Sequence, residues 1–351
     1  MPHITMNGEP RIVADCDIPF LKGVLEPFAR MTYVEGSRIA HDDLADADAL
    51  IIRTRTRCDA KLLEGTPVRL IATATIGYDH IDADYCAGRG IEVVTAQGCN
   101  ARGVLQYVSA ALYELSRRDA WAPHRMTLGV VGAGNVGSLV AEYGKRFGFR
   151  VLCCDPPKAA LDPQGGYLPL DELLSRSDIV TCHVPLTEGG PCPTLRMASR
   201  AFFSGMKPGA VFINSSRGKV VCDEALTEAL LDGRVSRAVI DTWNGEPKID
   251  RRLLSLVTLA TPHIAGYSIQ GKAAGTAAVV RAVGRRYGLP LADWYPPAVS
   301  PTRPDPSVGW EDMGKAMPRY FDIVAESERL KSRPEDFESI RNRYDYRTEF
   351  F

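Results

Sequence analysis

The feature that most constrains this chain is a glycine-rich turn, Gly132-Ala133-Gly134-Asn135-Val136-Gly137, between a predicted strand and a predicted helix. The apolar run Thr127–Val131 precedes it, and a helical pattern from Ser138 to Phe147 follows it. In such a turn the first glycine allows the tight bend, the second lets a pyrophosphate approach the backbone, and the third permits close helix packing. The turn therefore predicts a dinucleotide-binding α/β domain. The predicted cofactor contacts within it are Gly132, Gly134, Asn135, Val136 and Gly137.

An acidic residue follows at the position that such domains use to select the cofactor. A second β-branched run ends in Asp155, whose carboxylate is expected to accept hydrogen bonds from ribose hydroxyls and to repel a 2′-phosphate. The motif thus predicts NAD rather than NADP, although Lys158 is a nearby cation. Another nucleotide ligand, such as S-adenosylmethionine, stays open at this point.

The wider pattern predicts two doubly wound parallel-sheet domains. Short β-branched runs alternate with longer helical patterns, which is typical of parallel sheets covered by helices. We expect a substrate-binding (lid) domain at 1–102 and 265–289, a Rossmann domain at 103–264, and a C-terminal segment at 290–351. Helices are expected at Gly103–Arg118 and Ser268–Tyr287, and an amphipathic segment at Phe20–Arg30. The expected strands are Arg11–Ala14, Ala49–Arg53, Leu70–Ala74, Ile91–Thr95, Arg150–Cys154, Ile179–His183, Val211–Asn214, Ala238–Ile240 and Thr258–Ala260.

Composition narrows the class of ligand. A formal net charge of −1 over 351 residues offers no basic field for nucleic acid or for an anionic membrane, so we expect neither as a partner. Nine cysteines without a C-x-x-C pair favour reduced thiols in a cytoplasm over disulfides or a metal site. The expected ligand is therefore small and is held by a few local groups.

Three polar residues follow three successive predicted strands. Arg217 follows the strand ending at Asn214, Glu246 the strand ending at Ile240, and His263 the strand ending at Ala260. Ligands of open α/β sheets bind at the carboxyl ends of strands. A guanidinium there can hold a carboxylate, an imidazole can take a hydroxyl proton, and a carboxylate can orient that imidazole. The set predicts oxidation of a 2-hydroxy acid. His80 and His183 are weaker candidates, and we expect each to be structural or to line the cleft without acting as the base.

The order of these elements resembles the D-isomer-specific 2-hydroxyacid dehydrogenases. Within that family the chain is similar to a branch in the vitamin B6 route, on the stretches Ala72–Asp82, Gly98–Asn100, Cys154–Pro157 and His263–Ser268, with Gly271-Lys272 and Gly275-Thr276. The resemblance implies a flavodoxin-like lid domain beside the Rossmann domain and a short C-terminal dimerisation segment. It also implies a homodimer.

The resemblance further implies residue roles. Arg217 and Glu246 would be catalytic, with His263 as proton donor or acceptor. Further NAD contacts would be Asp155, Ser215, Ser216, Arg217, Asp241 and Gly266, with Val184 acting through its backbone. Substrate contacts would be Thr54, Thr75 and Tyr267.

The implied substrate is 4-phospho-D-erythronate, a small phosphorylated 2-hydroxy acid. Its phosphate requires cations, and Arg53-Thr54-Arg55-Thr56-Arg57 offers three arginines with period two, which would share one face of a strand end. We expect Arg53 to contribute. Two alternatives stay open: another 2-hydroxyacid dehydrogenase acting on phosphoglycerate, glyoxylate or hydroxypyruvate, and a non-catalytic NAD(H)-sensing protein on the same fold.

Overall fold

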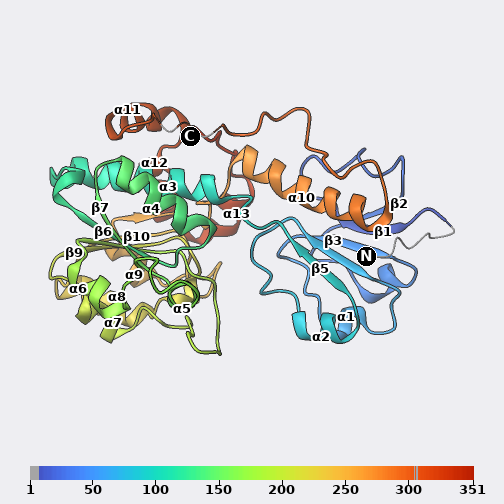
Figure 1. Cartoon of the computed structure of the whole chain (residues 1–351), viewed down its shortest axis with the longest axis horizontal. Coiled ribbons are helices and arrows are strands. Elements are labelled where there is room, and N and C mark those ends of the chain that lie inside the picture. Colours follow the sequence, from blue (N-terminus) through green and yellow to red (C-terminus); the bar gives the residue numbers. More distant parts are fainter. Residues whose placement is uncertain (1–7, 304, 306) are drawn as a thin grey trace. The chain divides into compact units, whose positions relative to one another are not determined.

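The computed structural model describes residues 8–303, 305 and 307–351, which form two compact units (Figure 1). Unit 1 contains the described residues up to Asn100 together with Ile269–Pro301. Unit 2 contains Ala101–Ser268 together with Thr302–Phe351. Most of the predicted C-terminal segment at 290–351 therefore belongs to unit 2.

Unit 1 is built on a five-stranded parallel sheet in the order β2-β1-β3-β4-β5, which confirms the predicted flavodoxin-like order. The central strands β3 and β4 are buried at every position, because helices cover both faces of a parallel sheet. The strands are β1 (Arg11–Asp15), β2 (Arg30–Val34), β3 (Ala49–Ile52), β4 (Leu70–Thr73) and β5 (Glu92–Thr95).

Two apolar layers sandwich this sheet. One contains Val279, Val280 and Val283 of α10 (Ile269–Tyr287), so the predicted return helix packs in unit 1. The other lies under α1 (Ala60–Leu63), α2 (Ala83–Gly88) and the 3-10 turn η1 (His41–Leu44). Asp59 and Asp82 cap α1 and α2 by accepting backbone N–H bonds, which satisfies donors that a helix N-terminus leaves unpaired.

Unit 2 is built on a six-stranded parallel sheet in the order β11-β10-β9-β8-β6-β7. The strand order reverses between β6 and β8, which is the crevice where ligands of doubly wound sheets bind. The strands are β6 (Thr127–Val131), β7 (Arg150–Cys154), β8 (Ile179–Cys182), β9 (Ala210–Asn214), β10 (Val235–Ile240) and β11 (Leu259–Ala260).

Helices cover both faces of the unit 2 sheet (Figure 1). One face carries α3 (Ala101–Asp119), α4 (Asn135–Arg146), α11 (Trp310–Tyr320) and α12 (Ile323–Ser332). The other carries α6 (Leu170–Arg176), α7 (Arg200–Gly205), α8 (Asp223–Leu231) and α9 (Arg251–Leu256). The remaining elements are α5 (Pro156–Leu161), α13 (Phe337–Asn342), η2 (Pro123–Arg125), η3 (Gly218–Val220) and η4 (Pro334–Asp336).

The C-terminal segment contributes to the core of unit 2. Met313, Phe321, Tyr344 and Phe351 are buried in the apolar cluster that also contains α3 and α4. The Phe351 ring lies 5.2 Å from the ring of Tyr143 on α4, a distance typical of favourable aromatic pairs. This segment is therefore part of the folded unit that carries the glycine-rich turn.

One expected helical segment is absent, and one observed strand was not expected. The amphipathic segment Phe20–Arg30 forms turns up to Ala29 in the described structure instead of a helix, and Phe20 has a positive φ of 64°. Arg30 begins β2, an edge strand whose residues are exposed or half-buried. An edge strand lacks the buried apolar run by which the other strands are recognised.

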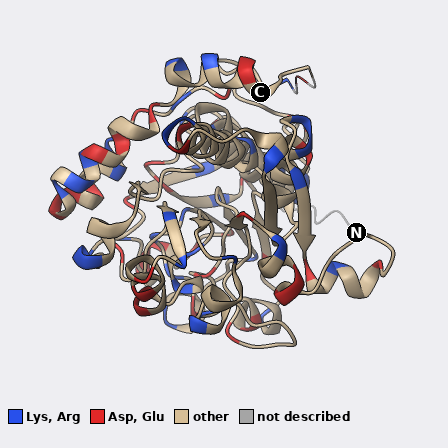
Figure 2. Ribbon diagram, turned by 90° about the vertical axis from the view of Figure 1, so that its left-hand side faces the viewer, with Lys and Arg blue, Asp and Glu red and all other residues tan. Residues whose placement is uncertain are grey.

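Figure 2 shows Lys and Arg residues interspersed with Asp and Glu residues along the ribbon. Among the described residues, no helix has the length and apolar character needed to cross a bilayer. None of the nine cysteines, all of which lie among the described residues, forms a disulfide.

Candidate active site

The candidate site lies at the carboxyl edge of the unit 2 sheet. All six strands are parallel, so the loops that follow them emerge at one edge. The glycine-rich turn follows β6, Asp155 follows β7, and Val184 lies two residues beyond β8. Arg217, Glu246 and His263 follow β9, β10 and β11, the three strands that are neighbours in the sheet.

The glycine-rich turn has the geometry that its glycines require. Gly132 has a φ of +87°, and a Cβ there would lie 2.8 Å from the His183 carbonyl oxygen and from the Val184 side chain. A Cβ on Gly137 would overlap the Gly132 carbonyl oxygen, whereas one on Gly134 would meet open space. The turn is thus tightly packed at Gly132 and Gly137 and open at Gly134. Helix α4 begins directly after Gly134, so its first backbone N–H groups are available to bind an anion.

Asp155 and Lys158 hold this turn from the neighbouring strand end. The Ala133 N–H donates to one Asp155 carboxylate oxygen (2.8 Å), and the Lys158 N–H donates to the other (3.1 Å). Lys158 Nζ donates to the Ala133 carbonyl (2.6 Å). A carboxylate offers about four lone-pair sites, so Asp155 keeps acceptor capacity for ribose hydroxyls. The residues present therefore fit a dinucleotide.

The loop that carries Arg217 is fixed by Asn214 at the end of β9. Asn214 Nδ2 donates to the Arg217 carbonyl (3.1 Å), and Asn214 Oδ1 accepts from the Ser216 N–H (3.1 Å) and hydroxyl (2.7 Å). A Cβ on Gly218 would overlap the Trp243 backbone, so the loops after β9 and β10 lie against each other. The buried Ser215 hydroxyl oxygen has no hydrogen-bond partner among the described residues, as expected of a group that awaits a ligand.

Asp241 organises the loop that carries His263. This carboxylate is 1% exposed and accepts from the Thr261 hydroxyl (2.7 Å), the Ile264 N–H (2.8 Å) and the Ala265 N–H (3.0 Å). Burial raises the pKa of Asp241, an effect that the His263 charge and these bonds partly offset. The structure thus gives Asp241 an organising role, and its contact with NAD stays a prediction.

Glu246 and His263 form a hydrogen-bonded pair. His263 Nδ1 lies 2.8 Å from Glu246 Oε2 and 3.1 Å from Oε1, and the Trp243 N–H donates to Oε1 (2.8 Å). Burial acts to raise the pKa of Glu246, but the bonds from His263 and Trp243 outweigh it and lower that pKa. An ionised carboxylate only accepts, so the Nδ1 nitrogen carries the proton and Nε2 is left as the basic nitrogen.

A residue from the C-terminal segment joins this pair. Arg341 of α13 donates from Nε to the Tyr267 hydroxyl (3.1 Å), and its Nη1 lies 3.6 Å from Glu246 Oε2. Sequence analysis did not identify Arg341, because nothing local distinguishes it from the neighbouring arginines 343 and 347. Its pairing depends on a contact between segments that are far apart in the chain.

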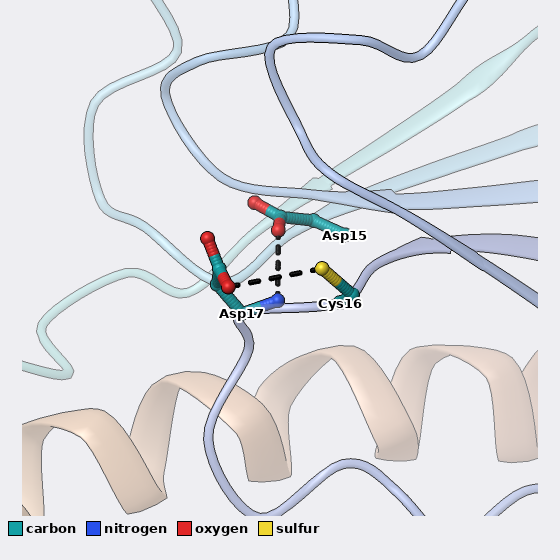
Figure 3. Close-up of side chains that lie close together, drawn as sticks. All are labelled: Asp15, Cys16 and Asp17. Atoms are coloured by element: carbon teal, nitrogen blue, oxygen red, sulfur yellow. Dashed lines mark hydrogen bonds between the residues drawn. The ribbon is translucent and has the colours of Figure 1, made fainter.

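In unit 1, Arg53 is bound to two carboxylates. Its Nε donates to Asp15 Oδ2 (2.9 Å) and its Nη2 to Asp17 Oδ2 (3.0 Å), and Asp15 is fully buried. Figure 3 shows that Asp15, Cys16 and Asp17 lie together, with the Asp17 N–H donating to Asp15 Oδ1. This cluster is thus the counterion of Arg53.

The three arginines do not share one face, so that expectation was wrong. β3 ends at Ile52, and the residues that follow turn instead of continuing as a strand. Arg55 and Arg57 line a hollow with Thr54, Asp79 and His80, whereas Arg53 contacts Asp15 and Asp17. Thr75 lies beyond β4, where its hydroxyl pairs with that of Thr73 (2.7 Å).

The two weaker histidine candidates have lowered basicity. Burial lowers the pKa of His80, and burial lowers that of His183 to about 3. His183 Nε2 is paired with the Thr181 hydroxyl (3.0 Å). Neither histidine has a carboxylate partner like that of His263 among the described contacts.

Comparisons with known proteins agree with this geometry. The family described as "D-isomer specific 2-hydroxyacid dehydrogenase, NAD binding domain" matches residues 103–265. Erythronate-4-phosphate dehydrogenase of Bacteroides thetaiotaomicron is 41% identical over 341 residues, 97% of each chain. The enzyme of the same name from Azotobacter vinelandii is 45% identical over 280 residues, 80% of this chain and 73% of its own length.

Solved structures show the same architecture. D-lactate dehydrogenase from Aquifex aeolicus, complexed with NAD and lactic acid, has a TM-score of 0.63 and 27% identity over 83% of this chain and all of its own. Residues 103–265 are thus an NAD-binding domain of this family. The chain belongs to the D-isomer-specific 2-hydroxyacid dehydrogenases, in the branch of the erythronate-4-phosphate dehydrogenases.

Proposed function

We propose that the protein oxidises 4-phospho-D-erythronate at C2 to 2-oxo-3-hydroxy-4-phosphobutanoate, with NAD as the hydride acceptor. The observation that carries the chemistry is the Glu246–His263 pair at the carboxyl edge of the NAD-binding sheet. The choice of substrate is supported by the relatives that share about 40% of the sequence along nearly the whole chain.

Three residues have distinct roles in the proposed oxidation. His263 Nε2 accepts the proton of the C2 hydroxyl while the C2–H bond gives up its hydride, so that the carbon–oxygen bond becomes a carbonyl. Glu246 holds Nδ1–H and stabilises the imidazolium that forms. Arg217 holds the substrate carboxylate and polarises the reacting oxygen. When bound, NAD supplies the carbon that accepts the hydride.

We also propose the contacts of both ligands. Asp155 selects NAD through the ribose hydroxyls, and Thr54, Thr75, Tyr267 and Arg53 contact the substrate. The other residues proposed to hold NAD are Gly132, Gly134, Asn135, Val136, Gly137, Val184, Ser215, Ser216, Arg217, Asp241 and Gly266.

A substrate panel tests the function. NADH formation is followed with 4-phospho-D-erythronate, 3-phospho-D-glycerate, glycolate and D-glycerate, each with NAD and with NADP. We expect the highest kcat/KM for 4-phospho-D-erythronate with NAD. A higher value for another acid would reassign the substrate, and NADH binding without turnover of any acid would indicate a sensing protein.

We further propose that the protein is a homodimer. Light scattering of the purified chain gives its mass directly. A single species at twice 38.4 kDa is expected, and a monomer at all concentrations would contradict the proposal.

A further inference from the structure

We propose that Arg341 is a positioning residue for catalysis, through which the C-terminal segment keeps the Glu246 carboxylate directed at His263. The inference rests on the proposed function. It assigns a catalytic consequence to a part of the chain that sequence analysis associated only with dimerisation.

The geometry gives Arg341 two partners at the site. Its Nη1 is 3.6 Å from Glu246 Oε2, the same oxygen that lies 2.8 Å from His263 Nδ1. Its Nε donates to the Tyr267 hydroxyl at 3.1 Å, and its guanidinium carbon lies 5.8 Å from the centre of the Tyr267 ring. One planar group therefore fixes both the orienting carboxylate and a proposed substrate contact.

The partial burial of Arg341 and Glu246 strengthens the interaction between their charges. Its side chain is 27% exposed and that of Glu246 is 18% exposed, so water screens this pair less than an open surface pair. Burial disfavours the charged form of Arg341, but Tyr267 and Glu246 outweigh burial and raise its pKa. Arg341 is also among the groups that lower the pKa of Glu246, after the bonds from His263 and Trp243.

Other charged and titratable groups near the pair lie on or beside three elements. Asp241 follows β10, and its burial is described above. Tyr344 and Arg347 follow α13 and bond to each other, and Tyr107 of α3 bonds to Thr261. Besides His263, the Glu246 carboxylate is paired with the Arg341 guanidinium.

Removal of the Arg341 guanidinium should change the pKa and the orientation of the Glu246 carboxylate. Without Arg341 the Glu246 carboxylate loses one of its stabilising charges, so its pKa rises and its orientation relaxes. The imidazole is then held less firmly in the tautomer that leaves Nε2 as the base. The loss falls on the chemical step, because NAD binds at the glycine-rich turn and Asp155.

The test is a double-mutant cycle between Arg341 and Glu246. NADH formation from 4-phospho-D-erythronate is measured for Arg341→Gln, Arg341→Lys, Glu246→Gln and the double variant Arg341→Gln/Glu246→Gln. We expect Arg341→Gln to lower kcat by about 10-fold to 100-fold with an NADH affinity within twofold of the parent. Arg341→Lys should restore most of that loss, and Arg341→Gln should have little further effect once Glu246 is already Gln.

Arg343→Gln is the matched control, because it removes an exposed arginine two residues away on the same segment. We expect it to retain the parent kcat. Equal losses for Arg341→Gln in both backgrounds, or losses confined to KM, would overturn the inference. If Arg341→Gln does not fold, Arg341→Met replaces it in the cycle, because methionine keeps an apolar stem over Tyr267. Arg341→Lys then still tests whether a positive charge restores kcat. An inactive parent enzyme with normal NADH binding would instead refute the proposed function.

Discussion

His263 has a φ of +59°, a backbone conformation that residues other than glycine seldom adopt. Three interactions with Asp241 hold it there: the His263 N–H donates to the Asp241 carbonyl (2.8 Å), and the next two N–H groups donate to the carboxylate. The strain is thus localised at the residue that faces the proposed reaction. Sequence analysis identified His263 and Asp241, but no sequence pattern reports that one fixes the backbone of the other.

Two glycines of the glycine-rich turn, Gly134 and Gly137, should differ in how an added methyl group affects stability. Gly137→Ala places a methyl group against the Gly132 carbonyl oxygen, whereas Gly134→Ala places it in open space. We expect Gly137→Ala to lower the free energy of unfolding by about 3 kcal/mol, as overpacking of a tight contact does. Gly134→Ala should fold with the parent Tm and weaken NADH binding alone. Urea unfolding, thermal unfolding and NADH fluorescence measure these effects, and equal free energies of unfolding and equal Tm values for both variants would contradict this packing.

At the scale of elements, a buried arginine of the C-terminal segment binds to other elements of unit 2. Arg347 is 6% exposed and donates to the carbonyls of Ile264 (2.9 Å), Gly103 (2.8 Å) and Ala265. Its guanidinium carbon also lies 4.4 Å from the centre of the Phe321 ring. The segment is therefore anchored to the start of α3 and to the loop that carries His263.

Replacement of this arginine should destabilise the protein. Arg347→Met leaves three buried carbonyls without that donor, and we expect the free energy of unfolding to fall by about 3 kcal/mol. Arg343→Met changes an exposed arginine and should alter stability by less than about 0.5 kcal/mol. Urea unfolding of both variants tests the difference. Indistinguishable midpoints would mean that the segment is not anchored through Arg347.

The sequence predicted the elements that have a regular pattern and missed those that depend on distant contacts. Buried strands such as β3 and β6 were predicted to within a few residues because their apolar runs are uninterrupted. The long helices α3 and α10 were predicted as closely because no proline interrupts their helical pattern. The edge strand β2 lacks such a run. The turn after Ile52 separates Arg53 from Arg55. Arg53 pairs with the buried Asp15 at the end of β1, and no local sequence pattern reports a contact with a strand so distant in the chain.

At the scale of the whole molecule, acid should weaken the fold through His183. Burial lowers its pKa from 6.5 to about 3, so the unfolded chain binds one more proton than the folded chain between these values. The free energy of unfolding therefore falls as the pH drops below about 6.5, by up to about 1.4 kcal/mol per pH unit from this group. His80, whose pKa is also lowered, acts in the same direction.

Urea unfolding at pH 7 and pH 5 measures this slope. His183→Gln should reduce it, and His124→Gln, at an exposed position, should leave it unchanged. A slope that is identical in the parent and in both variants would show that the His183 imidazole is not kept neutral by the fold.

The account depends most on His263 as the base for oxidation of the phosphorylated acid. The direct measurement is single-turnover NADH formation from 4-phospho-D-erythronate by the parent and by His263→Ala, with NADH affinity measured by fluorescence. We predict a loss of at least about 100-fold in the rate of the chemical step, as for removal of a general base, with NADH affinity retained. A His263→Ala variant that forms NADH at the parent rate would contradict the central claim.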